Sequence, residues 1–273
     1  MQKTSKNKVN SIKHYNCGYC VNHMKYIVKK PSVKKRNFYA GVFLIKHKKY
    51  GNILYDTGYS KEIYNCGLVG KIYNLLNPTF IKECETIDEQ LKKEKINPKD
   101  INFIILSHLH PDHIGCVKKF KNAKIIISRD CFNDYKKGKI RSLIFKKLLP
   151  NDFEERLSII EEYNLRFKYF KGHDLFEDGS LILTQINGHS LGQIGLLIQE
   201  HNIFLGGDSA WGLEFLDKVN EMSIFARFIQ NNFNDYKKGF DLLKKLKRDG
   251  IKIYLSHDDC FEKELIKWVN LQQ

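Results

Sequence analysis

Four side chains that could bind metal ions lie close together between His108 and His113. They follow an apolar stretch, residues 103–106, that is typical of a strand. His108 and His110 are two residues apart, so in extended backbone their side chains point to the same side. Asp112 and His113 come after the chain turns and face a different point in space. Imidazoles combined with carboxylates suit Zn²⁺, Fe or Mn, and this spacing favours two adjacent metal ions over one.

Three further candidate ligands come where later apolar stretches end. His189 lies in a glycine-flanked turn, Asp208 follows Gly206 and Gly207, and His257 follows the last apolar stretch. Loops at strand ends are where a rigid scaffold presents functional groups. Together with the dense motif, these residues indicate one metal site assembled from distant segments.

The elements that must position these residues alternate between short apolar strands and helices. Strands are expected at residues 38–46, 52–56, 102–107, 124–128, 166–171, 180–187, 193–199, 202–206 and 251–256. Helices are expected at residues 87–94, 111–120, 130–138, 152–164, 235–249 and 261–271. An early and a late group of strands, separated by helices, predict an α/β fold in which two packed sheets carry helices on the outside.

Composition excludes several classes of protein. The 273 residues are 42% hydrophobic and 28% charged, which is enough to bury a core and unlike a disordered chain. No apolar stretch approaches the roughly 18 residues that span a bilayer, and the N-terminus lacks the apolar part of a signal peptide. Seven irregularly spaced cysteines then favour reduced thiols, so we expect a cytoplasmic protein.

The chain is strongly basic, with 46 lysines and arginines against 31 acidic residues and a net charge of +15. Most of these cations are lysine, which is a well-hydrated surface residue, whereas arginine is the usual choice for bidentate phosphate contacts. The charge therefore favours a solvated surface, while an anionic partner such as nucleic acid is the less favoured alternative.

With these residues in place, the sequence resembles the metallo-β-lactamase superfamily from residue 38 to about residue 257. The resemblance implies a four-layer αββα sandwich with two divalent metal ions, zinc before Fe or Mn. The sequence itself predicts one domain over residues 14–273, because no linker rich in Pro, Gly or Ser divides it, with a frayed, polar and basic segment at residues 1–13 and a helical insert near residues 130–164. The resemblance assigns one metal to His108, His110 and His189, the other to Asp112, His113 and His257, and makes Asp208 the bridge.

The same resemblance adds a further carboxylate near the metals, Asp56, and limits the class of reaction. Asp56 is similar to the carboxylate that orients a ligand imidazole in this family. The redox-active diiron branch has glutamate where this chain has His110, so a hydrolytic site is expected. Asp112 and Asp208 are then the candidate catalytic residues. The implied reaction is attack of a metal-bridging hydroxide on a lactone, ester or thioester.

Within the hydrolases, the spacing is most similar to the N-acyl homoserine lactonase group. That group has a tyrosine three residues after the bridging aspartate, where this chain has Trp211, whose indole can donate a hydrogen bond but lacks phenol acidity. A phosphodiesterase or nuclease using the same metals is the main alternative, because phosphates favour basic proteins. A binding protein that retains only the fold is the third, and the complete ligand set argues against it.

Two secondary features leave alternatives open. The segment containing His14, Cys17, Cys20 and His23 could hold a structural zinc ion, but buried thiols packed on a sheet are the favoured interpretation. An aromatic and apolar stretch follows Asp56 and could line a substrate pocket or pack under a loop. The candidate pocket residues are Trp211, Tyr59, Tyr64 and Leu68. The expected partner is a small-molecule substrate, and a homodimer is left open.

Overall fold

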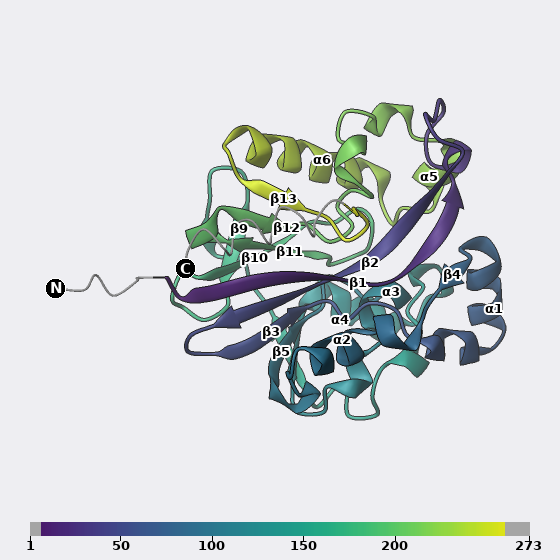
Figure 1. Cartoon of the computed structure of the whole chain (residues 1–273). Helices are drawn as coiled ribbons and strands as arrows, with labels where there is room; N and C mark the ends of the chain where they lie inside the picture. The colour runs from purple at the N-terminus through teal and green to yellow at the C-terminus, as the bar shows by residue number, and fades with distance from the viewer. Residues whose placement is uncertain (1–6, 260–273) are drawn as a thin grey trace.

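Two β-sheets packed face to face form the centre of the computed structural model, which describes residues 7–259 (Figure 1). The first sheet runs, in spatial order, β4 (Thr79–Phe80), β1 (Val9–His23), β2 (Lys35–His47), β3 (Gly51–Tyr55), β5 (Ile101–Ile105), β6 (Lys124–Ser128) and β7 (Leu157–Ile160). The second sheet runs β13 (Lys252–Tyr254), β12 (Ile203–Leu205), β11 (Ile194–Ile198), β10 (Leu181–Gln185), β9 (Lys171–Asp174) and β8 (Leu165–Arg166).

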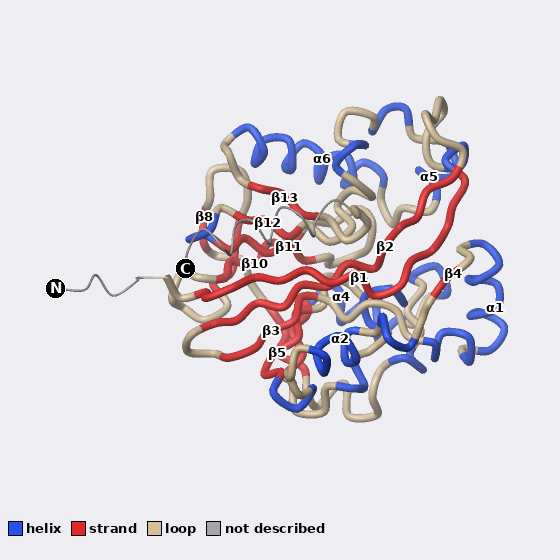
Figure 2. Tube along the Cα trace, viewed as in Figure 1, coloured by secondary structure: helices blue, strands red, loops and turns tan. Residues whose placement is uncertain are grey.

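Helices cover the outer face of each sheet, as the tube coloured by secondary structure makes plain (Figure 2). On the first sheet lie α1 (Gly67–Leu76), α2 (Ile87–Lys93), α3 (Pro111–Ile114) and α4 (Arg129–Lys137). On the second lie α5 (Ile224–Phe228) and α6 (Phe233–Arg248). The predicted four-layer αββα sandwich is therefore confirmed.

Alternation along the strands explains why both faces of each sheet are buried. Ile53 and Tyr55 of β3 point into the core between the sheets, while Leu54 points into the core beneath the helices. In β12, Ile203 and Leu205 face the first sheet. Strands buried on both faces are continuously apolar, which is why these short stretches could be recognised in the sequence.

The regular structure begins closer to the N-terminus than the sequence predicts. Residues 1–13 were predicted to be frayed, but β1 begins at Val9 and pairs antiparallel with β2 over most of its length. Val9 and Ile12 are buried in the core between the sheets. Polar residues, among them asparagines, alternate with these apolar residues, so β1 contains no apolar run by which a strand could be recognised. The prediction is therefore wrong for residues 9–13, and residues 1–6 lie outside the described part of the chain.

The segment near residues 130–164 is only partly helical. The predicted helix 130–138 matches α4, but the predicted helix 152–164 is wrong, because residues 157–160 form β7 and pair parallel with β6. The predicted strand 166–171 is instead mostly the turn between β8 and β9. Helices α1 and α5 were not predicted, and the predicted helix 261–271 lies outside the described residues.

The N-terminal histidines and cysteines do not form a zinc site. His14, Cys17, Cys20 and His23 all lie along β1, and an extended chain advances about 3.3 Å per residue. The two histidines are therefore roughly 30 Å apart along the strand and cannot share one ion. Cys17 and Cys20 are buried, as expected for thiols that pack on a sheet. Within residues 7–259, no helix combines the length and the apolar character needed to cross a membrane.

Burial of His14 predicts a pH-dependent stability. Its ring packs 4.9 Å from the ring of Phe43, and burial lowers its pKa from 6.5 to about 3. The unfolded chain therefore binds a proton below pH 6.5 that the folded chain excludes. We expect the free energy of unfolding to fall with acidification from pH 6.5 toward 3, by at most about 1.4 kcal/mol per pH unit from this group.

The measurement is chemical denaturation between pH 7 and 4 in the presence of a chelator, comparing wild type with His14→Phe. The variant should lose part of the acid sensitivity, because phenylalanine has no proton to gain. His173→Phe, on β9 and away from the N-terminal strand, serves as the control. An unchanged pH dependence in His14→Phe would contradict this assignment.

Candidate metal centre

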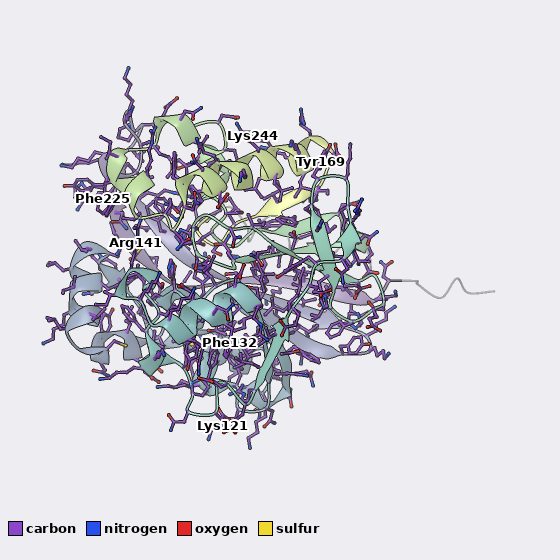
Figure 3. All side chains as sticks on the ribbon, turned by 180° about the vertical axis from the view of Figure 1, so that it is seen from behind. Lys121, Phe132, Arg141, Tyr169, Phe225 and Lys244 are labelled. Carbon is purple, nitrogen blue, oxygen red and sulfur yellow. The ribbon has the colours of Figure 1, made fainter. Side chains whose placement is uncertain are left out.

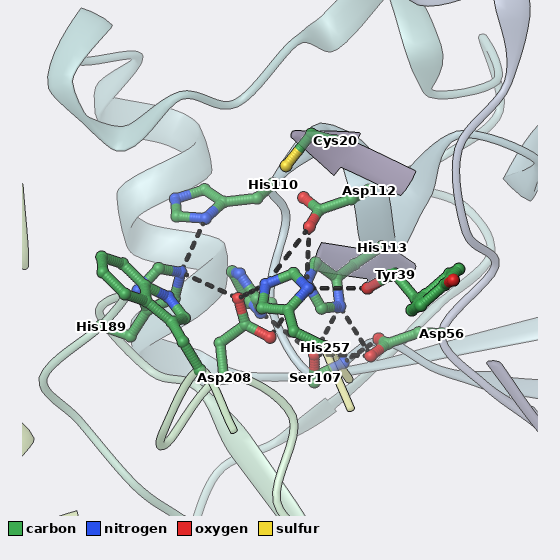
Figure 4. Close-up of polar contacts among 12 residues, drawn as sticks. Cys20, Tyr39, Asp56, Ser107, His110, Asp112, His113, His189, Asp208 and His257 are labelled. Atoms are coloured by element: carbon green, nitrogen blue, oxygen red, sulfur yellow. Dashed lines mark hydrogen bonds and ion pairs between the residues drawn. The ribbon is translucent and has the colours of Figure 1, made fainter. Parts of the chain in front are cut away.

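The seven predicted ligands come together at one edge of the sandwich, where strands of both sheets end. Figure 4 shows this cluster and labels all of the predicted ligands except His108. β3 and β5 run parallel, as do β12 and β13, so their carboxyl ends share an edge. The strand ends supply ligands as follows: His108 follows β5, His189 follows β10, Asp208 follows β12 and His257 follows β13. A tight turn at Gly207, with φ of +55°, brings Asp208 back over the edge.

Three histidines form the first cluster. Ring nitrogens of His108, His110 and His189 all lie within 4.8 Å of one another. His110 Nδ1 and His189 Nε2 are 3.0 Å apart. His110 also caps α3, whose first residue is Pro111, so the helix start fixes where the chain turns after the His-x-His pair.

Two carboxylates and two imidazoles form the second cluster, again with one atom from each within 4.8 Å of the others. Asp208 Oδ2 lies 2.9 Å from His257 Nε2, and Asp208 Oδ1 lies 3.4 Å from His113 Nε2. Asp112 Oδ2 lies 3.4 Å from His113 Nε2. Asp208 Oδ2 is also 3.3 Å from His189 Nε2 of the first cluster, so Asp208 lies between the two.

Four of these imidazoles have their other nitrogen held by a specific partner. Asp56 Oδ2 is 2.7 Å from His113 Nδ1, as predicted, and Asp56 also accepts hydrogen bonds from the Ser107 amide and hydroxyl. The remaining contacts, all at 2.7–3.0 Å, are His108 Nδ1 with Ser107 Oγ, His189 Nδ1 with Gln230 Oε1, and His257 Nδ1 with the Tyr39 carbonyl. Such contacts orient ligand imidazoles in metal sites.

The ligand atoms that take no part in these contacts are suited to bind a metal ion. His108 Nε2, His113 Nε2 and Asp208 Oδ1 are buried and have no hydrogen-bond partner among the described residues. Buried polar atoms without a partner are costly in a protein that binds nothing at that place. Burial lowers the pKa of His110 to about 3 and that of His108 well below its usual range, which keeps both imidazoles in the neutral, ligating form.

In the second cluster, the carboxylates and imidazoles shift one another's pKa strongly. Although burial opposes it, the Asp112, Asp56 and Asp208 carboxylates raise the pKa of His113 well above its usual value. Although burial again opposes it, His257 and His113 hold the pKa of Asp208 well below its usual range. His113 also lowers the pKa of Asp112 against the effect of burial. Asp112 and Asp208 therefore favour the ionised form and attract positive charge, which is the environment that a divalent cation needs.

A cavity beside the two clusters is lined by two of the four predicted pocket residues, Tyr59 and Trp211. The other two, Tyr64 and Leu68, lie outside this lining: the Tyr64 hydroxyl donates to the Thr79 carbonyl and Leu68 is 72% exposed. Further lining residues, besides the metal-site residues His110, Asp112, His189, Asp208 and His257, are Cys20, Asn22, Tyr26, Ile27, Phe38, Tyr73, Asn77, Leu143, Phe225 and Ile229.

Trp211 lies beside the first cluster but, unlike a tyrosine at this position, has no acidic hydroxyl to donate. Its ring meets that of His189 edge-on at 5.9 Å, and its carbonyl accepts a hydrogen bond from Arg36. Two other phenols, those of Tyr59 and Tyr73, line the cavity. Their hydroxyl oxygens lie 2.8 Å apart and form a buried hydrogen bond. The cavity therefore contains phenolic hydroxyls, although none comes from position 211.

Gln230 and the Tyr39 carbonyl are site groups that sequence reasoning missed. Gln230 lies 41 residues after His189, between α5 and α6, and its amide also donates to the Ala226 carbonyl. A single glutamine in a loop has no distinguishing spacing, and a backbone carbonyl has no side-chain signal at all. Only the folded arrangement could reveal them.

A four-layer sandwich with histidines and aspartates at its strand ends defines a class of metal-binding α/β proteins. The chain belongs to the metallo-beta-lactamase superfamily, whose family model matches residues 40–251. That span includes six of the seven clustered residues, and His257 lies just beyond it.

Curated relatives within the superfamily are named N-acyl homoserine lactonases. The AiiB protein of Rhizobium rhizogenes is 28% identical over 62% of this chain and 62% of its own length. The AttM protein of Azorhizobium caulinodans is 25% identical over 79% of this chain and 80% of its own. A Bacillus cereus lactonase is 30% identical over 63% of this chain and 72% of its own. The chain thus spans less than two thirds of the first of these relatives.

Solved structures agree on the fold. An N-acyl homoserine lactone hydrolase with N-hexanoyl-L-homoserine at its catalytic metal centre is similar, with a TM-score of 0.74 and 23% identity. The alignment covers 94% of this chain and 96% of that one. AidC, a dizinc quorum-quenching lactonase, has a TM-score of 0.60 and 18% identity, over 93% and 87% of the two chains.

Proposed function

We propose that this protein is a dinuclear metal-dependent hydrolase that cleaves a lactone, ester or thioester. The observation that carries the proposal is the pair of ligand clusters joined by Asp208 at one sheet edge. His108, His110 and His189 would hold one divalent ion, and Asp112, His113 and His257 would hold the second. Asp208 would contact both. Imidazole and carboxylate ligands suit zinc, with Fe or Mn as alternatives.

A pair of such metals supplies a water of lowered pKa and a Lewis acid for the substrate oxygen. The chain itself orients the ligands through Asp56, Gln230 and the Tyr39 carbonyl. Asp208 would hold the metal pair, because its carboxylate is ionised and faces the cavity. Tyr59 and Tyr73 would donate a hydrogen bond to the substrate, in place of a tyrosine at position 211.

The lining of the cavity favours an uncharged acyl substrate over a phosphodiester. Among the described residues that line it, none is lysine or arginine. Apolar and aromatic side chains such as Phe38, Ile27 and Phe225 predominate instead. A phosphodiesterase or nuclease remains the second candidate, since the net charge of +15 favours anionic partners, but that charge lies outside the cavity.

A paired turnover assay tests the proposal. Protein loaded with Zn²⁺ or Mn²⁺ is given a long-chain N-acyl homoserine lactone and, separately, an activated phosphodiester. We expect hydrolysis of the lactone that is abolished by a chelator and restored by the metal. Turnover of the diester alone would replace the acyl hydrolase with the phosphodiesterase, and turnover of neither together with no metal binding would overturn both.

A further inference from the structure

Large apolar side chains are exposed around the mouth of the cavity, on three segments far apart in the sequence. Helix α1 buries only Gly70 and Tyr73 and leaves its other apolar residues in solvent. Tyr26 and Val33 are exposed in the connection between β1 and β2. Around α5 the exposed residues include Ile224, at 82%, and Phe228, at 69%. We call residues 24–35, 67–76 and 224–229 together the mouth face.

The three segments form one continuous surface. A groove of about 690 Å³ is lined by residues of all three, among them Tyr26, Leu75, Leu76 and Phe225. The rings of Tyr26 and Phe225 meet edge-on at 6.2 Å. The same Tyr26 and Phe225 line the metal-site cavity, so the groove and the cavity are adjacent. Figure 1 places α1, α5 and the β1–β2 connection at the end of the molecule opposite the start of β1, and Figure 3 shows Phe225 and Arg141 on that end from behind.

The charge of the mouth face has one sign. Residues 24–35 contain five lysines and no acidic residue, and Lys71 and Arg227 add two cations from α1 and α5. Residues 67–76 and 224–229 also contain no aspartate or glutamate. The five lysines of the connection are exposed. Exposed apolar side chains interspersed with cations characterise surfaces that insert into anionic lipid. The exposed Glu221, whose carbonyl accepts from the Lys29 amide, is an acidic residue at the border of the mouth face.

We propose that the mouth face docks on an anionic phospholipid bilayer, with the metal-site cavity opening toward the lipid. Apolar residues of α1 and α5 enter the boundary between headgroups and acyl chains, while the lysines of residues 24–35 contact the phosphates. Each cation near an anionic surface strengthens binding about fivefold. The arrangement would admit an amphiphilic molecule from the bilayer directly to the cavity.

Two other occupants fit the surface less well. A symmetric dimer would bring the same patch of two copies together, so that the seven cations of one mouth face would meet the seven of the other. A single acyl chain in the groove would cover Tyr26 and Phe225. It would leave Leu68, Ile224 and Phe228 exposed, because these residues line neither the groove nor the cavity.

The test is sedimentation of the metal-loaded protein with vesicles of 30% phosphatidylglycerol in phosphatidylcholine, against vesicles of pure phosphatidylcholine. Two variants address the two components: Ile224→Asp with Phe228→Asp, and Lys29→Glu with Lys30→Glu and Lys34→Glu. Matched controls elsewhere are Leu165→Asp, which is 42% exposed on β8, and Lys121→Glu with Lys137→Glu and Lys247→Glu. Because all substituted side chains are half-buried or exposed, we expect each variant to keep its metal content and melting temperature.

Binding to the anionic vesicles should fall at least tenfold in both mouth-face variants and change less than twofold in both controls. Absence of wild-type binding to the anionic vesicles would overturn the proposal. So would equal losses in the controls, or a dimer in light scattering that Ile224→Asp with Phe228→Asp dissociates. Hydrolysis of a soluble short-chain lactone by the same samples reports the proposed function separately, because it needs no vesicle.

Discussion

Replacement of Asp208 by asparagine is expected to abolish hydrolysis while the fold persists. The Asp208 carboxylate lies 2.9 Å from His257 Nε2 and 3.3 Å from His189 Nε2, so it joins the two ligand clusters. An amide keeps the shape but removes the charge and replaces one ligating oxygen with N–H groups that cannot bind a cation. We expect kcat/KM for the lactone to fall by at least about 10²–10³-fold, the scale of losing one preorganised electrostatic contact at a reacting centre.

Metal content distinguishes this role from general damage. Wild type should hold two ions per chain after loading and dialysis, and Asp208→Asn should retain fewer than two with an unchanged circular dichroism spectrum. Asp134→Asn, which changes a buried aspartate of α4 away from the site, is the matched control and should keep both ions and full turnover. If Asp208→Asn keeps two ions and wild-type turnover, Asp208 does not join the metals.

The seven clustered residues could be predicted from sequence because four of them, namely His108, His189, Asp208 and His257, follow short apolar strands, and the other three come within five residues of His108. Apolar runs such as residues 203–205 are recognisable by themselves, and the polar residue that follows must lie at a sheet edge. The His-x-His-x-Asp-His spacing added the local direction of four side chains. The structure brings atoms of all seven into two clusters, so the local pattern identified residues that are neighbours in space, and their role as metal ligands belongs to the proposed function.

Features that depend on long-range pairing could not be predicted in the same way. β1 lacks an apolar run and becomes a strand because it pairs with β2, and β7 is a strand because it extends the sheet beside β6. Side-chain exposure in α1 is another example. The apolar stretch after Asp56 was consistent with a pocket wall that included Leu68 or with packing under a loop. The helix instead exposes Leu68 to solvent and directs Tyr73 toward the cavity.

Net charge alone also gave an incomplete prediction, because the position of the charged residues decides which ligands they can contact. A lysine-rich solvated surface and an anionic partner were both open interpretations of +15. The cavity lining has neither lysine nor arginine among the described residues, whereas residues 24–35 beside its mouth carry five lysines. The lysines therefore cannot contact the reacting atoms in the cavity, but they can contact an anionic partner beside its mouth.

The second large effect is expected from Asp56→Asn, a residue that would touch neither metal nor substrate. Asp56 is fully buried, accepts from the Ser107 amide at 2.7 Å and from the Ser107 hydroxyl at 2.8 Å, and lies 2.7 Å from His113 Nδ1. By accepting the Nδ1 proton, it fixes the tautomer that leaves His113 Nε2 free to ligate. An asparagine must turn its NH₂ group toward one of these donors.

We expect Asp56→Asn to weaken metal binding about 10- to 100-fold and to lower the free energy of unfolding by about 1–3 kcal/mol. The backbone is not the cause, because Asp56 has φ of 64° and asparagine adopts this left-handed conformation readily. Competition with a chromophoric chelator measures the affinity, and urea denaturation of the metal-free protein measures the stability.

Ser107→Ala is the graded control, since it removes one donor to Asp56 but leaves the carboxylate beside His113. It should weaken metal binding less than Asp56→Asn does. Asp100→Asn, at an exposed helix cap, should leave metal binding unchanged. Because the affinity is measured on the metal directly, the result does not depend on which substrate the enzyme cleaves. Wild-type affinity in Asp56→Asn would mean that the ligand imidazole of His113 is oriented by its packing alone.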